Sequence, residues 1–128
     1  VAGLVHRRIT HALQRRAAVV LQKSIREGFG LTVAEAMWKE TPVIGGKAGG
    51  ICYQIADGVN GFLVSSIDEA VQRMVQLIRD GELRRQMAVK ARESVRDRFL
   101  LSRLLEQYLD MINSFETVYC LRTDSARA

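Results

Sequence analysis

Two glutamates, Glu27 and Glu35, flank a glycine-containing turn and have the clearest potential for chemistry in this sequence. A carboxylate accepts hydrogen bonds from hydroxyl groups, so each suits a sugar or a ribose diol. The helix predicted to begin near Thr32 offers unpaired N–H groups and the positive end of its dipole. Phosphate is the natural ligand of such a helix start, and Gly28 and Gly30 let the backbone come close to it. The pattern predicts a site for phosphates and for hydroxyl groups on either side of them.

Each part of this pattern also has a purely structural interpretation. Thr32 and Glu35 match the S/T-x-x-E capping box, in which Glu35 would only cap its own helix. Glu27 would then be a surface charge before a turn, and the two glycines would serve a tight turn. The combination is more specific than any single feature, but these alternatives stay open at this point.

The elements that must position the pattern alternate between strand and helix. Short apolar runs predict three strands, the first of them buried on both faces, and helical spacing predicts short helices between them. The alternation indicates an α/β fold with a parallel sheet, a Rossmann-like partial doubly wound sheet with three of the usual six strands. The expected ranges are helix 6–16, strand 18–22, helix 32–40, strand 43–45, helix 51–56 and strand 61–64.

The C-terminal part is predicted to be helical. Ser66 and Glu69 have capping-box spacing, and three apolar stripes follow. We expect one domain over residues 1–115 and a polar, frayed tail over residues 116–128. The stripes are Ile67, Ala70, Val71, Met74, Val75 and Ile78, then Leu83, Met87, Ala91, Val95 and Phe99, and finally Leu101, Leu104, Leu105, Tyr108, Leu109 and Ile112.

The composition narrows the class of protein. The net charge is +5, but the basic residues alternate with acidic ones along helices, as on solvated helix faces, which argues against a nucleic-acid partner. No apolar run approaches the ~20 residues of a membrane span. The only cysteines, Cys52 and Cys120, have neither metal-ligand spacing nor a disulfide pattern. We therefore expect a cytoplasmic protein without a membrane partner.

The stretch from Glu27 to Met37 resembles the E-x7-E signature of retaining GT-B glycosyltransferases of family 4. Three later blocks, 41–45, 49–51 and 57–64, resemble the blocks that follow it in that family, and the resemblance covers about residues 6–113. Within the family, residues 21–39 and Gln54 most resemble the trehalose synthase group, with fungal-type trehalose phosphorylases next.

The resemblance implies a role for each site residue. Glu35 would bind the ribose hydroxyls, and Glu27, the catalytic residue of the set, would contact hydroxyls of the donor glucose. The turn would face the diphosphate, and Lys23 and Arg26 would add positive charge. Enzymes of this kind transfer glucose from a nucleoside diphosphate glucose to glucose with retention, reversibly, giving α,α-trehalose; they need no covalently bound cofactor and no obligatory metal. The turn residues are Gly28, Phe29, Gly30, Leu31 and Thr32.

The resemblance also implies that the chain is the second half of a C-terminal GT-B domain. The basic groups that would stabilise the departing diphosphate and the acceptor-binding domain lie outside it, so we expect no transferase activity from this chain alone. Strand 18–22 would have an open edge and helix 101–112 an uncovered stripe, which predicts a homodimer or larger assembly. The alternatives are a trehalose phosphorylase, another family 4 enzyme, a non-catalytic nucleotide-binding module or a self-associating remnant.

Overall fold

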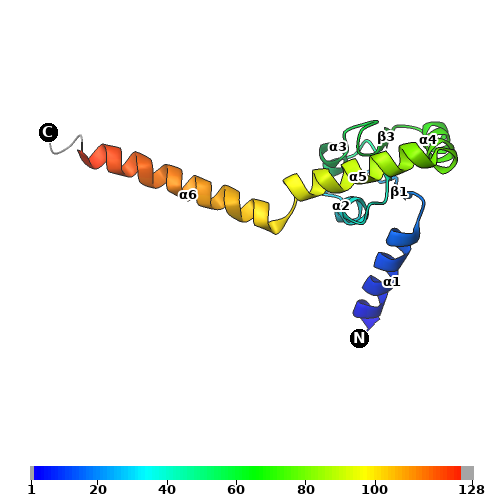
Figure 1. Ribbon diagram of the computed structural model, residues 1–128, viewed down its shortest axis with the longest axis horizontal. Helices are drawn as coiled ribbons and strands as arrows, with labels where there is room; N and C mark the ends of the chain where they lie inside the picture. Colours follow the sequence, from blue (N-terminus) through cyan, green and yellow to red (C-terminus); the bar gives the residue numbers. More distant parts are fainter. Residues whose placement is uncertain (1, 125–128) are drawn as a thin grey trace. The chain divides into compact units, whose positions relative to one another are not determined.

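A computed structural model describes the backbone of residues 2–124 and the side chains of residues 5–115. The chain divides into two compact units, Val1–Arg96 and Asp97–Ala128, which are described separately. Strands and helices alternate in the first unit as the sequence predicts (Figure 1). The elements are α1 (Ala2–Arg16), β1 (Val20–Gln22), α2 (Leu31–Trp38), β2 (Val43–Gly46), α3 (Gly50–Gln54), β3 (Phe62–Val64), α4 (Ile67–Arg79), α5 (Gly81–Arg98) and α6 (Leu101–Asp124).

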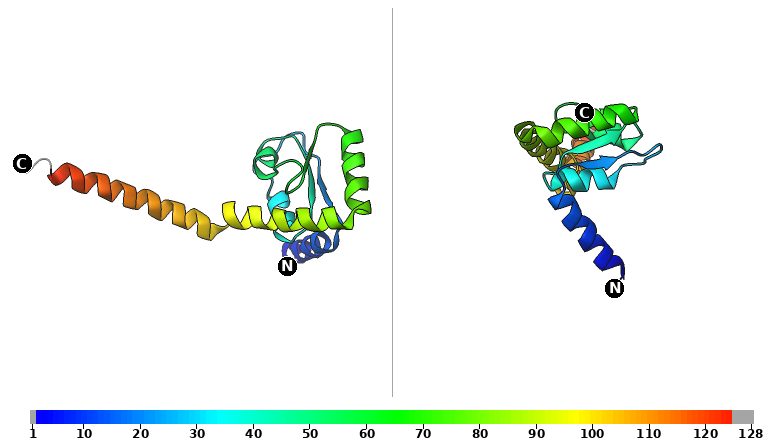
Figure 2. Two further views of the ribbon diagram at one scale, coloured as in Figure 1. Left: turned by 45° about the horizontal axis from the view of Figure 1, so that its top comes forward. Right: turned by 90° about the vertical axis from the view of Figure 1, so that its right-hand side faces the viewer.

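The three strands form one parallel sheet in the order β1-β2-β3 (Figure 2). Leu21 pairs with Ile44 across β1 and β2, and Ile44 pairs with Phe62 across β2 and β3. This confirms the predicted α/β class. Because parallel strands end at the same edge of a sheet, the loop after β1 and the loop after β2 lie side by side.

Each face of the central strand β2 is covered by different helices. Ile44 belongs to an apolar cluster that includes Phe62 from β3, Leu77 from α4 and Met87 from α5. Gly45 points the other way, since consecutive strand residues face opposite sides, and a β carbon there would meet Ile51 and Ile55. Thus α4 and α5 pack on one face and α3 packs on the other.

The expectation that the first strand is buried on both faces is wrong. Leu21 is 43% exposed, and Val20 and Gln22 are only half-buried. The reason is the strand order: β1 is an edge strand that pairs with β2 alone among the described residues. An apolar run identified from sequence cannot distinguish a central strand from an edge strand.

The capping box that begins α4 is confirmed, whereas the apolar stripe predicted for this helix is partly wrong. The residues that face the core are Ala70 and Leu77, with Met74 half-buried between them. The predicted stripe omitted Leu77 and included four residues that are exposed, because α4 carries two neighbouring apolar rows and only one contacts the sheet. The exposed residues are Ile67, Val71, Val75 and Ile78.

The stripe predicted for α5 agrees with the structure in part: Met87, Ala91 and Val95 are buried and Leu83 is half-buried, whereas Phe99 lies beyond the end of this helix. The second unit is mainly one helix, α6, as the sequence predicts. Its large apolar side chains up to Phe115 are each at least 46% exposed. Residues 116–128 lie outside the part whose side chains the structure describes, so the frayed tail stays a prediction.

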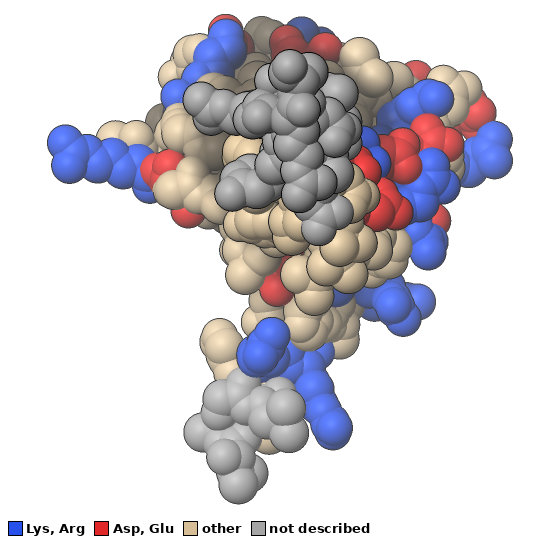
Figure 3. Space-filling view, turned by 90° about the vertical axis from the view of Figure 1, so that its left-hand side faces the viewer, with Lys and Arg blue, Asp and Glu red and all other residues tan. Residues whose placement is uncertain are grey.

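The charge distribution follows the sequence pattern. On the face drawn in Figure 3, Lys and Arg side chains stand apart from one another with Asp and Glu between some of them. Several ion pairs are local, such as Arg85 with Glu82 and Arg103 with Glu106, each at 3.0 Å. Among the described residues, no helix is both long and apolar enough to cross a membrane.

Candidate functional site

The predicted site residues lie at the carboxyl ends of β1 and β2, where two loops are in direct backbone contact. The N–H of Gly50 donates to the carbonyl of Gly28 at 2.7 Å. A β carbon at Gly49 would lie 1.8 Å from the carbonyl oxygen of Glu27, and one at Gly50 would lie 2.2 Å from that of Gly28. Both distances are impossible for a side chain, so this approach requires glycine on the β2 side.

The turn ends at Gly30, which adopts a left-handed conformation with φ 81° and precedes the first residue of α2. Its carbonyl accepts from the N–H of Val33 at 2.9 Å. The N–H groups of Gly30, Leu31 and Thr32 have no acceptor among the described residues. A left-handed residue followed by a right-handed one makes a concave group of N–H donors, which binds anions. The helix start can therefore accept a phosphate.

Glu27 is held in place by two neighbours that sequence reasoning did not identify. Its Oε2 accepts from Ser24 Oγ at 3.1 Å and from Gln22 Nε2 at 3.3 Å, and Gln22 also donates to Ser24 at 2.9 Å. The other carboxylate oxygen has no partner in the described part of the chain. The arrangement fixes the carboxylate and leaves one oxygen to accept from a ligand hydroxyl.

Glu35 lies one turn into α2 and is half-buried. The capping-box alternative is wrong: the N-cap residue is Gly30, and no side chain caps this helix. Thr32 lies inside the helix, since the left-handed Gly30 sets the start of α2 before it. No described residue donates a hydrogen bond to the carboxylate of Glu35. This carboxylate is therefore available to a ligand.

Lys39, the C-cap residue of α2, lies one turn after Glu35. Its ammonium donates to Gln14 Oε1 at 2.7 Å and to the Glu35 carbonyl at 3.0 Å. Burial lowers the pKa of Lys39, which the charge of Glu35 partly restores and that of Arg15 lowers further. Lys39 thus ties α2 to α1.

The other predicted site residues lie on the solvent side of the turn. Phe29 is 46% exposed, Leu31 is 64% exposed and Thr32 is exposed. Lys23 is also exposed, and its stem lies against Gly46 at the end of β2. At Gly28 a β carbon would meet nothing within 4 Å, so there is open space beside the backbone at this position. The structure brings these residues together along one open rim.

Gln54, the last residue of α3, also contacts the turn, although the roles implied by the family resemblance do not include it. It is fully buried, and its Nε2 donates to the carbonyls of Phe29 and Gly30, the latter at 3.3 Å. Gln54 follows the turn residue Gly30 by 24 residues, so spacing gives no signal for it. Gln22 and Ser24 are close to Glu27 in the sequence, but their contacts depend on a loop conformation that spacing does not specify. Only the tertiary structure reveals them.

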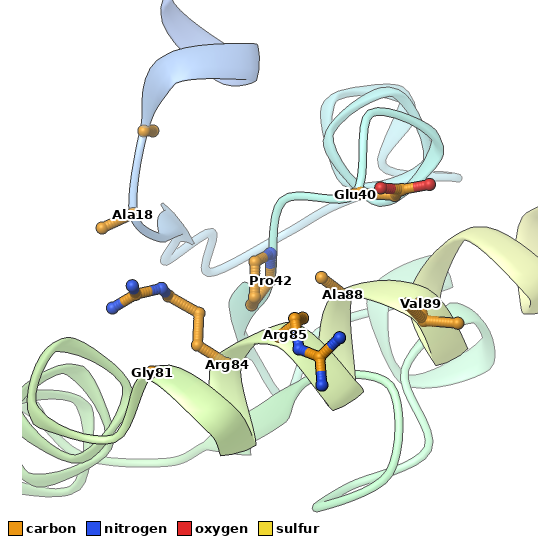
Figure 4. Close-up of a pocket in the computed structure, with 9 residues that line it drawn as sticks. Ala18, Glu40, Pro42, Gly81, Arg84, Arg85, Ala88 and Val89 are labelled. Atoms are coloured by element: carbon orange, nitrogen blue, oxygen red, sulfur yellow. The ribbon is translucent and has the colours of Figure 1, made fainter.

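A pocket of 360 Å³ lies at the opposite end of the sheet and takes no part in this arrangement (Figure 4). Ala18 precedes β1 and Pro42 precedes β2, so both line the pocket at the amino ends of the strands. Ligand crevices of open parallel sheets lie at the carboxyl ends. In the described part of the chain, no three His, Cys, Asp or Glu side chains gather as a metal site would require.

The fold is that of a GT-B glycosyltransferase C-terminal domain. The C-terminal domain of a group 1 glycosyltransferase from Francisella tularensis, LpcC, matches with a TM-score of 0.66 and 33% identity, over 70% of this chain and 47% of that one. Anabaena HepE in complex with UDP-glucose matches with a TM-score of 0.71 and 28% identity, over 80% of this chain and 29% of that one.

The family model "Glycosyl transferases group 1" matches residues 3–94, and the chain belongs to this family. A trehalose synthase from Pyrococcus horikoshii is 52% identical over 110 residues, which are 86% of this chain and 26% of that enzyme. The chain thus spans about a quarter of the length of this relative. The family and the likeness to trehalose synthases confirm the resemblance found in the sequence.

Proposed function

We propose that this chain is the nucleotide-sugar-binding part of a trehalose synthase-like glycosyltransferase. The observation that carries the proposal is the start of α2. Three N–H groups there have no acceptor among the described residues, and an available carboxylate precedes them in the sequence and another follows them. A nucleoside diphosphate sugar has the matching order of groups: sugar hydroxyls, two phosphates and ribose hydroxyls. The 52% identity to a trehalose synthase favours glucose as the sugar.

In this proposal the residues divide the ligand between them. Glu27 accepts hydrogen bonds from hydroxyls of the donor glucose, and Glu35 accepts from the ribose diol. The N–H groups of Gly30, Leu31 and Thr32 face the diphosphate, and Lys23 adds positive charge beside it. A resident cofactor and a metal have no part in the proposal.

The complete enzyme, in this proposal, transfers glucose from a nucleoside diphosphate glucose to glucose with retention and forms α,α-trehalose. The diphosphate leaves with its negative charge, and stabilising that charge requires donors beyond those of this chain. We therefore propose that this chain alone is inactive. We also propose that the complete enzyme works in the cytoplasm. An assay with UDP- or ADP-glucose as donor and glucose as acceptor tests the first point, and trehalose formation above background would contradict it.

Binding is tested by calorimetric titration of the chain with UDP, ADP and UDP-glucose. Glu35→Gln should weaken UDP and UDP-glucose about equally, by roughly tenfold, because both carry the ribose. Glu27→Gln should weaken only UDP-glucose, toward the affinity of UDP. Glu40→Gln, just past the other end of α2, is the matched control and should bind like the wild type. An absence of nucleotide binding by the wild-type chain would contradict the proposal.

Self-association is a second proposal and depends on apolar surface. One apolar row of α4 is exposed, and the described large apolar side chains of α6 are exposed as well. Exposed apolar surface of this kind favours association. The edge of β1 is also open in the three-stranded sheet. We propose a homodimer or a larger assembly, and a single monomeric mass by light scattering across concentrations would contradict it.

A further inference from the structure

Helix α1 differs in charge from the other helices that contain arginine. It has four arginines and two histidines but no aspartate or glutamate. In α4, α5 and α6 basic and acidic residues are mixed, and pairs such as Arg85 with Glu82 form within one helix. Since α1 contains no acid to offset them, its arginines account for most of the net charge of +5. Much of the unbalanced positive charge therefore lies on one helix of the first unit.

The last turns of α1 border a pocket of 360 Å³, which we call the α1–α2 pocket. Ligand pockets commonly have volumes of about 300–1,000 Å³, so this one is large enough for a small ligand. Lys39, the C-cap residue of α2, lines it together with residues of α1. Most of the lining residues are basic, and none of them is acidic. They are His11, Ala12, Arg15, Arg16 and Lys39.

Polar groups of the α1–α2 pocket lack partners within the protein. Arg15 and Arg16 are exposed and have neither a hydrogen bond nor an ion pair among the described residues. Nδ1 of His11 is buried and has no hydrogen-bond partner there either. The ammonium of Lys39 donates two hydrogen bonds within the protein, so one of its three protons remains available. The pocket can therefore offer several donors to one ligand.

The protein does not balance the charges of this pocket. Burial lowers the pKa of Lys39, Glu35 partly restores it and Arg15 lowers it further, so two of the cations are close enough to repel each other. Helices α1 and α2 both end at the pocket, and the carboxyl end of a helix carries roughly half a negative charge. The two ends offset about one of the three positive charges of Arg15, Arg16 and Lys39. About two positive charges remain among the lining groups, which matches an anion with two negative charges.

We propose that the α1–α2 pocket is a binding site for a phosphate group with two negative charges, carried by inorganic phosphate or by a small phosphomonoester. An arginine side chain can donate two parallel hydrogen bonds to phosphate oxygens, and a lysine adds a compact charge. The site is distinct from the start of α2, because Lys39 caps the carboxyl end of that helix. The proposal does not depend on the proposed function, whose ligand would contact the amino end of α2.

The first test is a titration of the ¹⁵N-labelled chain with inorganic phosphate at constant ionic strength, followed by NMR. The backbone amide signals of Ala12, Arg16 and Lys39 should shift in a saturable way, because these residues line the pocket. The signals are read residue by residue, so phosphate bound at the start of α2 would be recognised at Leu31 and Thr32. An absence of saturable shifts at the three pocket residues would overturn the proposal, whatever happens at Leu31 and Thr32.

The second test removes single charges from the pocket. Arg15→Gln and Arg16→Gln change exposed side chains without described partners, so the fold should be kept. Each should weaken phosphate about fivefold, and the double variant should weaken it more than about tenfold. Arg79→Gln removes the same charge at the end of α4, outside the pocket, and is the matched control. Equal weakening by Arg79→Gln would show a general effect of net charge and overturn the proposal.

The third test identifies the anion. If glycerol 3-phosphate binds more tightly than inorganic phosphate and the two arginine variants weaken it, the ligand is a phosphomonoester. If the two bind equally, the phosphate group alone is recognised. Acetate carries one negative charge and should bind at least about tenfold more weakly than phosphate. Equal binding of acetate and phosphate would overturn the assignment of a doubly charged ligand.

Discussion

The loops at the carboxyl ends of β1 and β2 are fixed by backbone contacts, whereas α4 and α5 are fixed by apolar side chains. The loops meet at Gly49 and Gly50, where no β carbon fits, and a buried amide joins them to α3. The helices bury Leu77 and Met87 against the sheet and have ion pairs at the surface. Among the described residues, backbone donors and carboxylate oxygens of the loop region have no partner, whereas polar side chains of α5 pair with one another, as Arg85 does with Glu82. A binding site and its scaffold therefore respond differently to substitution.

The largest expected effect on stability is in the helical scaffold. Leu77→Ala removes a fully buried side chain from the cluster with Ile44 and Phe62 and should lower the free energy of unfolding by about 3 kcal/mol. Urea unfolding followed by circular dichroism measures it. Ile78→Ala, the next residue but 55% exposed, is the control and should change little. Equal losses for the two variants would mean that the core is not arranged as described.

A substitution in the loop region should lower the unfolding free energy less than Leu77→Ala does, but it should weaken UDP binding more. Gly50→Ala places a β carbon 2.2 Å from the Gly28 carbonyl and 2.6 Å from the Phe29 Cα, so the two loops must separate. We expect a loss of about 2 kcal/mol in unfolding free energy and no measurable UDP binding. Gly81→Ala, at the start of α5 and outside the turn, is the control, because its β carbon would come no closer than 3.7 Å to its nearest neighbour. If Gly50→Ala bound UDP normally, the contact between the loops would be irrelevant to the site.

The smallest effect is expected at the start of α4. Ser66 Oγ accepts from the Glu69 N–H at 3.1 Å, and Ser66→Ala should cost about 1 kcal/mol of unfolding free energy. Ser65→Ala, which leaves the backbone donor of the box intact, is the control. UDP binding should be unchanged in both variants, because α4 is far from the turn in the sequence and no contact between α4 and the turn is found among the described residues. Weaker binding by Ser66→Ala would show that scaffold and site are coupled.

The same cap gives a pH dependence with a defined sign. Hydrogen bonds from the backbone N–H groups of Ser65 and Ser66 hold the pKa of Glu69 below its ordinary value of 4.5. A carboxyl group whose folded-state pKa is lowered stabilises the fold above its unfolded-state pKa and loses this contribution as pH falls through the folded-state pKa. Glu69→Gln should therefore lose less stability than the wild type between pH 4.5 and more acidic conditions. Parallel stability curves for the two proteins would contradict this assignment.

The sequence predicted the order of the elements because that order depends on local patterns, and the same kind of pattern predicts the candidate site. The glycine turn, the start of α2 and the Ser66–Glu69 cap are formed by residues a few positions apart. The prediction failed where two apolar rows share one helix: α4 buries Leu77 and exposes Val71. Which row contacts the sheet depends on the angle at which the helix packs, and a periodic pattern does not contain that angle.

By itself, then, the sequence determined the α/β class and the family, and it predicts a ligand site at the carboxylates of residues 27 and 35. The tertiary structure decided that β1 is an edge strand and that Glu35 is free of its own helix cap. It also decided that Gln22 and Ser24 hold Glu27, and that Gln54 holds the turn. The physical reason for Gln54 is range, because its hydrogen bonds form only after parallel strands have brought separate loops to one edge of the sheet. The hydrogen bonds of Gln22 and Ser24 with Glu27 are local, but they depend on the conformation of the loop after β1, which residue spacing does not specify.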